Sequence, residues 1–264
     1  MKAVRKGSPP SAELYLRRAE ELLRRIREEQ APRLAEAAEL MADAIAGEGV
    51  VYLFGSGHSV LPAMDVFPRY GSFVGFRPLL DPRLMWWNVL GPGGVRELLW
   101  LERSEGYARI FLGSYRLRPR DVMLVYSHGG LNAAPVEVAL EAKRIGLRVI
   151  AVTSLGNARR SPPTHSSGKR LADVADVVID NSVPAEDALV RVDGLAEPLA
   201  AGSTLAAVAI SMALVAEVGA RLVDRGLHLD VFVSPNASGV VPEHNASVFE
   251  AHRRALERSD GHGS

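Results

Sequence analysis

Four short runs of apolar residues constrain the fold of this chain more than any other feature. They span residues 50–54, 121–126, 148–153 and 175–180. Each run has the length and continuous apolar character of a strand that is buried on both faces. A helical pattern follows the second run, from Val136 to a stop at Gly146. Strands that alternate with helices predict βαβ units, and therefore an α/β fold with a parallel sheet and helices on both faces.

Helical segments flank this core. Residues 11–47 carry an N-cap signal at Ser11 and an apolar stripe, and predict one or two amphipathic helices with a break near Pro32. A long apolar helix is expected after Gly202-Ser203-Thr204, whereas residues 154–170 are expected to be a loop.

The expected organisation is one α/β domain with terminal extensions, because no repeat and no composition shift marks a second domain. We expect neither helix nor strand over 234–245, and frayed residues from 259 onward. The predicted boundaries are a flexible tail (1–10), N-terminal helices (11–47), the α/β domain (48–233) and a C-terminal segment (234–264).

Composition excludes several classes of function. The absence of cysteine removes disulfides, thiolate nucleophiles and Cys-ligated metals. With 31 basic and 31 acidic residues the chain has no overall field that would attract nucleic acid or an acidic membrane. We see neither a signal peptide nor a run of about 18 uncharged apolar residues that would span a bilayer, and expect a cytoplasmic protein with no membrane partner.

Three glycine- and serine-rich turns suggest where a ligand binds. They are Gly55-Ser56-Gly57-His58-Ser59 after the first run, Ser127-His128-Gly129-Gly130-Leu131-Asn132 after the second, and Gly202-Ser203-Thr204 before the last helix. The carboxyl ends of parallel strands meet at one edge of a sheet, where amides and hydroxyls suit an anion such as phosphate. Val60 breaks the dinucleotide fingerprint, and no Gly-Lys-Ser/Thr follows either strand, so the Walker pattern also fails.

These turns, together with Asp176-Val177-Val178-Ile179-Asp180-Asn181 and the tail Ser234-x-Asn236 … Glu243-His244-Asn245, resemble the sugar isomerase (SIS) domain family, in particular its uncharacterised phosphosugar-isomerase-like bacterial branch. The resemblance implies a three-layer α/β/α sandwich of the flavodoxin/Rossmann type, a sugar phosphate as ligand, and a dimer with sites at subunit contacts. Gly129 stands where the family usually has a serine, which removes one phosphate-binding hydroxyl.

The function that we expect is aldose–ketose isomerisation of a sugar phosphate, which needs a general acid and a general base but no cofactor. His58, Asp65 and His244 compete for proton transfer, although Asp65 is equally well explained by a salt bridge to Arg69. His128 and Glu197 are weaker candidates. The expected sugar-phosphate ligands are Gly55, Ser56, Gly57, Ser59, Ser127, Gly129, Gly130, Asn132, Ser203, Thr204 and Asn245, with the phosphate between the first two turns and the start of the helix at 203.

Three alternatives stay open. The chain could bind a sugar phosphate as a sensor without turnover, or act as an amino-sugar phosphate etherase. A metal site of His58, His128 and His244 carries no ligand spacing, and no metal is expected. For assembly we expect a homodimer in which His244 or Asn245 reaches the partner's 55–59 turn, with Leu14, Leu22 and Ile26 in the contact; the alternative is a monomer.

Overall fold

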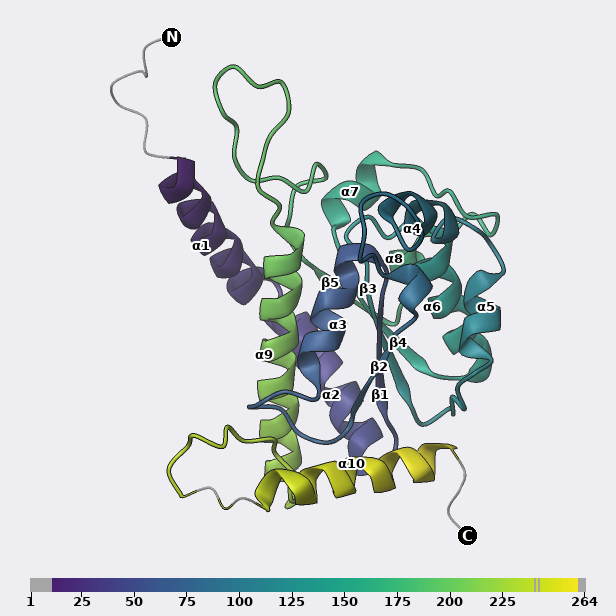
Figure 1. The fold of residues 1–264 in the computed structure, drawn as a ribbon, viewed down its shortest axis with the longest axis vertical. Helices are drawn as coiled ribbons and strands as arrows, with labels where there is room; N and C mark the ends of the chain where they lie inside the picture. The colour runs from purple at the N-terminus through teal and green to yellow at the C-terminus, as the bar shows by residue number, and fades with distance from the viewer. Residues whose placement is uncertain (1–10, 240, 242, 261–264) are drawn as a thin grey trace.

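A five-stranded parallel sheet forms the centre of the protein in the computed structural model, which describes residues 11–239, 241 and 243–260 (Figure 1). The strand order is β2-β1-β3-β4-β5. The strands are β1 (Val51–Gly55), β2 (Phe76–Leu79), β3 (Val122–Tyr126), β4 (Arg148–Thr153) and β5 (Val177–Asp180). The four apolar runs are therefore confirmed as strands. The short edge strand β2 was not expected from the sequence; it contains Pro78, which only an edge strand accommodates well.

Helices cover both faces of the sheet, and this confirms the three-layer α/β/α fold. Side chains of β1 alternate between the two layers: Val51 and Leu53 join one apolar cluster, and Tyr52 and Phe54 join the other. The first cluster lies under α1 (Ser11–Glu29), α2 (Ala31–Ala46), α3 (Val60–Val66) and α9 (Ser203–Asp224). The second lies under α4 (Val95–Leu101), α5 (Tyr107–Leu112), α6 (Ala133–Ile145) and α8 (Leu171–Val174).

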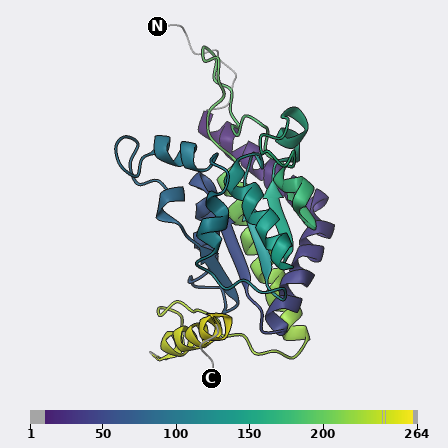
Figure 2. The ribbon, with the colours of Figure 1, turned by 90° about the vertical axis from the view of Figure 1, so that its right-hand side faces the viewer.

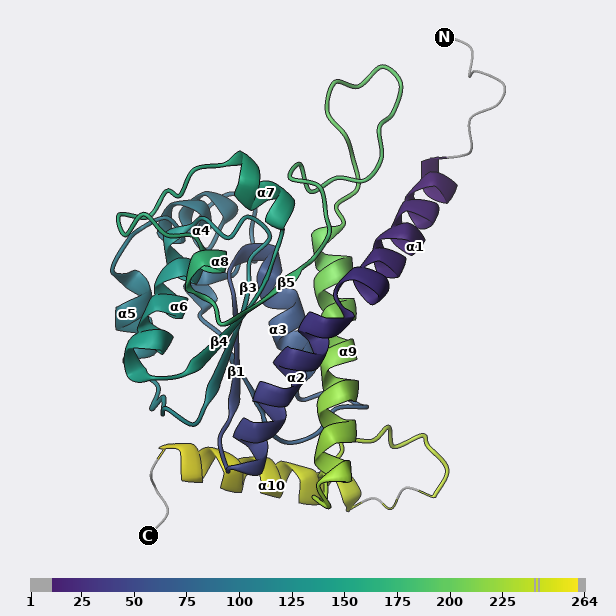
Figure 3. The same ribbon diagram turned by 180° about the vertical axis from the view of Figure 1, so that it is seen from behind.

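The N-terminal helices are part of the same core. They separate at Gln30, just before Pro32, as expected, and run beside α9 when the molecule is seen from behind (Figure 3). Leu22 and Ile26 of α1 are 4% and 5% exposed within this one chain. This corrects the expectation that these two residues supply a dimer contact, because their apolar surface is already buried. The predicted tail 1–10 lies outside the described residues.

Helix α9 corrects a second expectation. Its 22 residues are long and apolar enough, by length and composition, to cross a membrane, although we expected no such stretch. It packs against α2 and α3, and its Ile210, Leu214 and Val218 are almost completely buried. A helix with this packing is a core helix.

Helices α4, α5, α7, α8 and α10 were not expected from the sequence. Helix α7 (Leu155–Arg160) lies within the segment 154–170 that was predicted to be a loop. There are also two short 3₁₀ helices among the described residues, η1 (Gly57–Ser59) and η2 (Pro82–Leu84). Helix α10 (His244–Asp260) crosses the end of the sheet where the strands begin (Figures 1 and 2). Aromatic contacts hold it there: His252 packs on Phe67, and Phe249 packs on Phe232.

Candidate functional site

A narrow cleft opens at the carboxyl edge of the sheet, where β1, β3 and β5 end near the start of α9. This position agrees with the rule that ligands bind beyond the carboxyl ends of parallel strands. The cleft brings together four predicted ligand residues, Ser59, Ser127, Ser203 and Thr204, and His58, which was predicted to transfer a proton. Its lining residues are His58, Ser59, Pro62, Tyr126, Ser127, His128, Val152, Asn181, Ser203, Thr204 and Ala207.

The turn after β3 offers a row of backbone donors. Gly130 N donates to Ser127 Oγ at 3.1 Å, which leaves the Ser127 hydroxyl proton free. Gly130 has a φ of +63°, and a Cβ there would lie 2.7 Å from Thr153 Oγ1, so only glycine fits. The amides of Gly129, Leu131 and Asn132 make no hydrogen bond to any part of the chain that the structure describes. Successive free amides in such a turn form an anion-binding concavity.

The turn after β1 is held tightly by its own backbone. A Cβ on Gly55 would lie 2.0 Å from the carbonyl oxygen of Ser59, so the close return of the chain requires glycine at this position. Ser59 N donates to Ser56 O at 3.1 Å. The exposed His58 ring packs on Trp86, with ring centroids 4.2 Å apart. Trp86 therefore fixes His58 at the mouth of the cleft.

Glu102, at the end of α4, connects the two turns, and the sequence analysis missed it. Ser56 Oγ donates to Glu102 Oε2, and Asn132 Nδ2 donates to Glu102 Oε1, each at 2.8 Å. The residue is 7% exposed, and burial raises the pKa of its carboxyl group above the ordinary value, although the bond from Ser56 opposes this. Glu102 stands in a segment with no motif, so no sequence signal pointed to it.

A second carboxylate occupies the start of α9. Asp187 accepts hydrogen bonds from Gly202 N at 3.2 Å, from Ser203 N at 2.8 Å and from Ser203 Oγ at 2.6 Å. Asp187 therefore caps the helix from a residue far upstream, which satisfies two of its free amides. The hydroxyl of Ser203, expected to donate to a phosphate, donates to this carboxylate. Among the predicted ligands, Ser59, Ser127 and Thr204 keep hydroxyl protons that no described group accepts.

His128 and Tyr126 complete the wall of the cleft. The His128 ring lies between Asn181 Nδ2, 3.3 Å from Nδ1, and Ala185 O, 3.4 Å from Nε2. The hydroxyls of Tyr126 and Ser211 are 2.8 Å apart, and Ser211 Oγ donates to Ala207 O. Burial raises the pKa of Tyr126, so its hydroxyl stays neutral and serves packing and hydrogen bonding.

Three predicted residues lie away from the cleft. Asp65 Oδ2 pairs with Arg69 Nη1 at 2.5 Å on the exposed side of α3, which is the salt-bridge alternative. His244 Nε2 contacts Val231 O at 2.8 Å, and the Asn245 side chain bonds the backbone of Val233. Both residues begin α10, at the opposite end of the sheet. In one chain His244 therefore cannot join His58 and His128 in a metal site, and among the described residues no group of three His, Asp or Glu side chains is placed to hold a metal.

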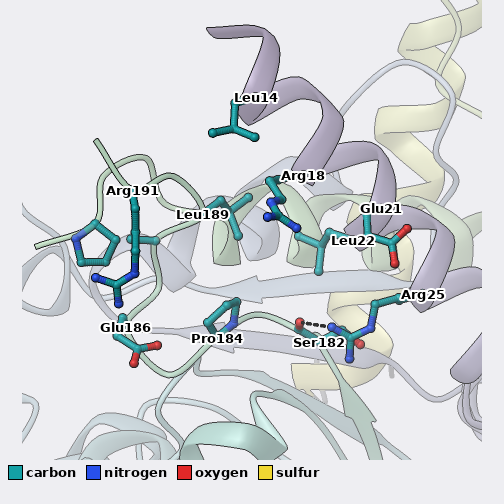
Figure 4. A pocket seen from close by; sticks show the side chains of 12 residues that line it. Leu14, Arg18, Glu21, Leu22, Arg25, Ser182, Pro184, Glu186, Leu189 and Arg191 are labelled. Carbon is teal, nitrogen blue, oxygen red and sulfur yellow. Dashed lines mark hydrogen bonds between the residues drawn. The ribbon is translucent and has the colours of Figure 1, made fainter. Parts of the chain in front are cut away.

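A larger hollow, of about 400 Å³, lies between α1 and residues 182–198 (Figure 4). Arg18, Arg25 and Arg191 line it beside Glu21 and Glu186, so its charges are mixed. Arg25 Nη1 donates to Ser182 O at 3.4 Å. The hollow contains none of the residues predicted to bind ligand, and we place the candidate site in the smaller cleft because residues of all three predicted turns line it.

Comparison with known proteins adds to this geometry. The SIS domain family matches residues 14–154. The UPF0309 protein SCO4393 of Streptomyces coelicolor is 37% identical over 236 residues, which cover 89% of this chain and 92% of that protein. The UPF0309 protein BH0227 of Halalkalibacterium halodurans is 36% identical over 92% of this chain and 94% of its own length.

Among solved structures, the phosphoheptose isomerase GmhA of Neisseria gonorrhoeae has a similar fold. Its TM-score is 0.54 at 16% identity, with 79% of this chain and 97% of that chain covered. At this identity the likeness concerns the fold alone.

Proposed function

Because the chain belongs to the UPF0309 family of SIS-domain proteins, we propose that it binds a sugar phosphate in the cleft at the carboxyl edge of the sheet and interconverts its aldose and ketose forms. The observation that carries this proposal is the turn after β3, where the amides of Gly129, Leu131 and Asn132 have no partner among the described residues. No lysine or arginine lines the cleft, so the anion is held by amides and hydroxyls.

The phosphate fits best between the turn after β3 and Thr204. Ser127 belongs to the same turn as the free amides, and it lines the cleft together with Thr204 from the start of α9. The predicted place between the first two turns is less suitable, because the Glu102 carboxylate bridges the side chains of Ser56 and Asn132 there and repels an anion. The sugar then extends toward His58 and Ser59.

Isomerisation moves a proton from one carbon to its neighbour and shifts the carbonyl group between them, so atoms balance without an added oxidant or cofactor. His58 and His128 are the two histidines that line the cleft, and an imidazole is the side chain best suited to accept and return a proton near neutral pH. His58, which is exposed at the mouth and held by Trp86, faces the sugar end. We assign proton transfer to His58, because both ring nitrogens of His128 already face Asn181 and Ala185.

A binding protein without turnover is the second candidate. Among the residues that line the cleft there is no aspartate or glutamate, and carboxylates are common general bases in proton abstraction from carbon. The described ring contacts of His58 are with Trp86, which offers no carboxylate to orient the imidazole. A sensor would keep the phosphate-binding site and lack a group that transfers the proton between the two carbons of the sugar.

A thermal-shift screen with a panel of sugar phosphates tests the proposal, since a ligand that binds the folded state raises Tm. We expect at least one sugar phosphate to raise Tm, and Gly130→Ala to abolish the shift because the new Cβ meets Thr153. Gly168→Ala is the matched control: its φ of +69° resembles that of Gly130, but nothing lies within 4 Å. Incubation of the ligand followed by NMR then separates an isomerase, which produces the second sugar, from a sensor, which leaves the ligand intact. If no sugar phosphate shifts Tm, the proposal fails.

We also propose a homodimer, with a different contact from the one predicted by the sequence. Helix α9 leaves Met212, Ala216 and Ala220 along a shallow apolar groove beside Phe73, and Val223 is 58% exposed. This face suits a second copy of the chain better than α1 does. Light scattering of the purified protein tests the dimer. Mixing His58→Ala with His244→Ala then tests a shared site: activity returns in mixed dimers only if the two residues act from different subunits.

A further inference from the structure

The two hydrogen bonds that Glu102 accepts decide whether the turn after β1 binds the phosphate or the sugar part of a ligand. We propose that Glu102 is a positioning residue that makes the Ser56 hydroxyl an acceptor of hydrogen bonds from sugar hydroxyl groups, and so selects a polyhydroxylated ligand over a bare anion at this end of the site. The inference rests on the proposed function of the cleft and adds a residue that selects the ligand.

The donors and acceptors are fixed by chemistry. A carboxylate only accepts hydrogen bonds, so both contacts at 2.8 Å must be donated by its partners. Ser56 has one hydroxyl proton, and it is directed at Glu102 Oε2. The Nδ2 group of Asn132 is directed at Oε1, which turns its Oδ1 to the other side. Ser56 has therefore only lone pairs left to offer, which accept hydrogen bonds from a ligand, whereas Asn132 keeps one N–H donor as well as its Oδ1 acceptor.

The carboxylate is held in place from its backbone. Glu102 N donates to Leu98 O at 2.9 Å, and Ala134 N, in the first turn of α6, donates to Glu102 O at 2.9 Å. Its side chain is buried, and no lysine or arginine forms an ion pair with it among the described residues. Arg103 is the neighbouring cation, but it forms no ion pair with Glu102. A fixed carboxylate without an ion-pair partner repels phosphate, whereas a sugar hydroxyl can donate to the Ser56 lone pairs beside it.

Glu102→Gln tests whether the carboxylate makes Ser56 an acceptor, because glutamine has almost the same shape but carries no charge and can donate hydrogen bonds. The glutamine amide group donates to one partner, so at Ser56 the hydroxyl proton becomes free to point into the site. We expect the dissociation constant of the sugar phosphate identified in the screen to rise about tenfold, the loss of roughly one good hydrogen bond. The dissociation constant of inorganic phosphate, measured by calorimetry, is expected to stay within about twofold or to fall.

Glu105→Gln is the control, because this carboxylate lies on the same segment and bonds Ser166 at the surface. It should leave both constants unchanged. If Glu102 only held the turns together, Glu102→Gln would weaken sugar phosphate and inorganic phosphate equally, and the proposal would be wrong. An unchanged affinity for both ligands would overturn it as well.

A measurement without ligand separates this inference from the proposed function. In a double-substitution cycle, Glu102→Gln and Ser56→Ala should change Tm non-additively, because each removes the same hydrogen bond. Additive shifts would overturn the role of Glu102 even if sugar phosphates bind. Non-additive shifts in a protein that binds no sugar phosphate would refute the proposed function and leave the contact between Glu102 and Ser56 standing.

Discussion

Replacing Asp187 by alanine should loosen the start of α9 and at the same time expose a new anion site. The carboxylate accepts three hydrogen bonds, two from the amides of Gly202 and Ser203 and one from the Ser203 hydroxyl. Loss of an N-cap side chain costs about 0.5–2 kcal/mol. Because the bonds are charge-assisted and the helix is long, we expect about 2 kcal/mol, near the upper end of this range. For a chain of this size that corresponds to a fall in Tm of about 4–8 °C.

Differential scanning calorimetry measures this fall, and phosphate gives the second readout. In Asp187→Ala the amides of Gly202 and Ser203 and the Ser203 hydroxyl are free to donate hydrogen bonds to inorganic phosphate. Phosphate should therefore raise the Tm of this variant by more than it raises the Tm of the unaltered protein. Asp193→Ala is the control, since Asp193 lies exposed in the same segment. An unchanged Tm in Asp187→Ala would refute the capping role, and an equal phosphate shift in both proteins would refute the idea that Asp187 covers an anion site.

Three further outcomes follow from the same contacts. Gly55→Ala should cost at least about 2 kcal/mol of stability, measured by urea unfolding, because a Cβ 2.0 Å from the Ser59 carbonyl oxygen forces the turn apart. Asp65→Asn should change stability by less than about 1 kcal/mol and leave ligand affinity unchanged in calorimetry, because its salt bridge with Arg69 is largely exposed. Burial raises the pKa of Glu102 above 4.5, so the folded protein binds this proton more tightly than the unfolded chain. Unfolding free energy should therefore fall as pH rises from about 4.5 through the raised pKa, and Glu102→Gln should lack that component.

The parts of the fold that the sequence predicted are those encoded by local patterns. Continuous apolar runs identified four strands, and glycine marked the end of α6, where Gly146 takes a φ of +106°. Strand β2 has too few residues for a pattern and contains a proline. Helix α10 has a weak apolar face, and its position depends on Phe67 and Phe232, which are distant in sequence. Contacts of this kind cannot be read from periodicity.

The candidate site divides in the same way. Glycine positions were predictable because the chain can turn back at Gly55 or Gly130 only without a side chain. The carboxylates were not, because Glu102 and Asp187 come from segments without a motif and reach the turns only through the tertiary fold. The assignment of His244 and Asn245 came from a resemblance in the tail, and in this chain both side chains bond the backbone of residues 231–233.

The carboxylates of Glu102 and Asp187 explain how a cleft lined by neutral groups can bind a sugar phosphate in one orientation. Each carboxylate accepts a hydrogen bond from a serine that the sequence predicted to bind phosphate: Ser56 donates to Glu102, and Ser203 donates to Asp187. Serine hydroxyls can face either way, so a motif rich in serine does not specify whether it donates to a ligand or accepts from it. A fixed carboxylate removes that freedom, because it accepts only. Free hydroxyl protons remain at Ser59, Ser127 and Thr204, none of which bonds Glu102. We therefore expect an anion to bind at Ser127 and Thr204, and sugar hydroxyl groups to bind beside Ser56 and its carboxylate partner.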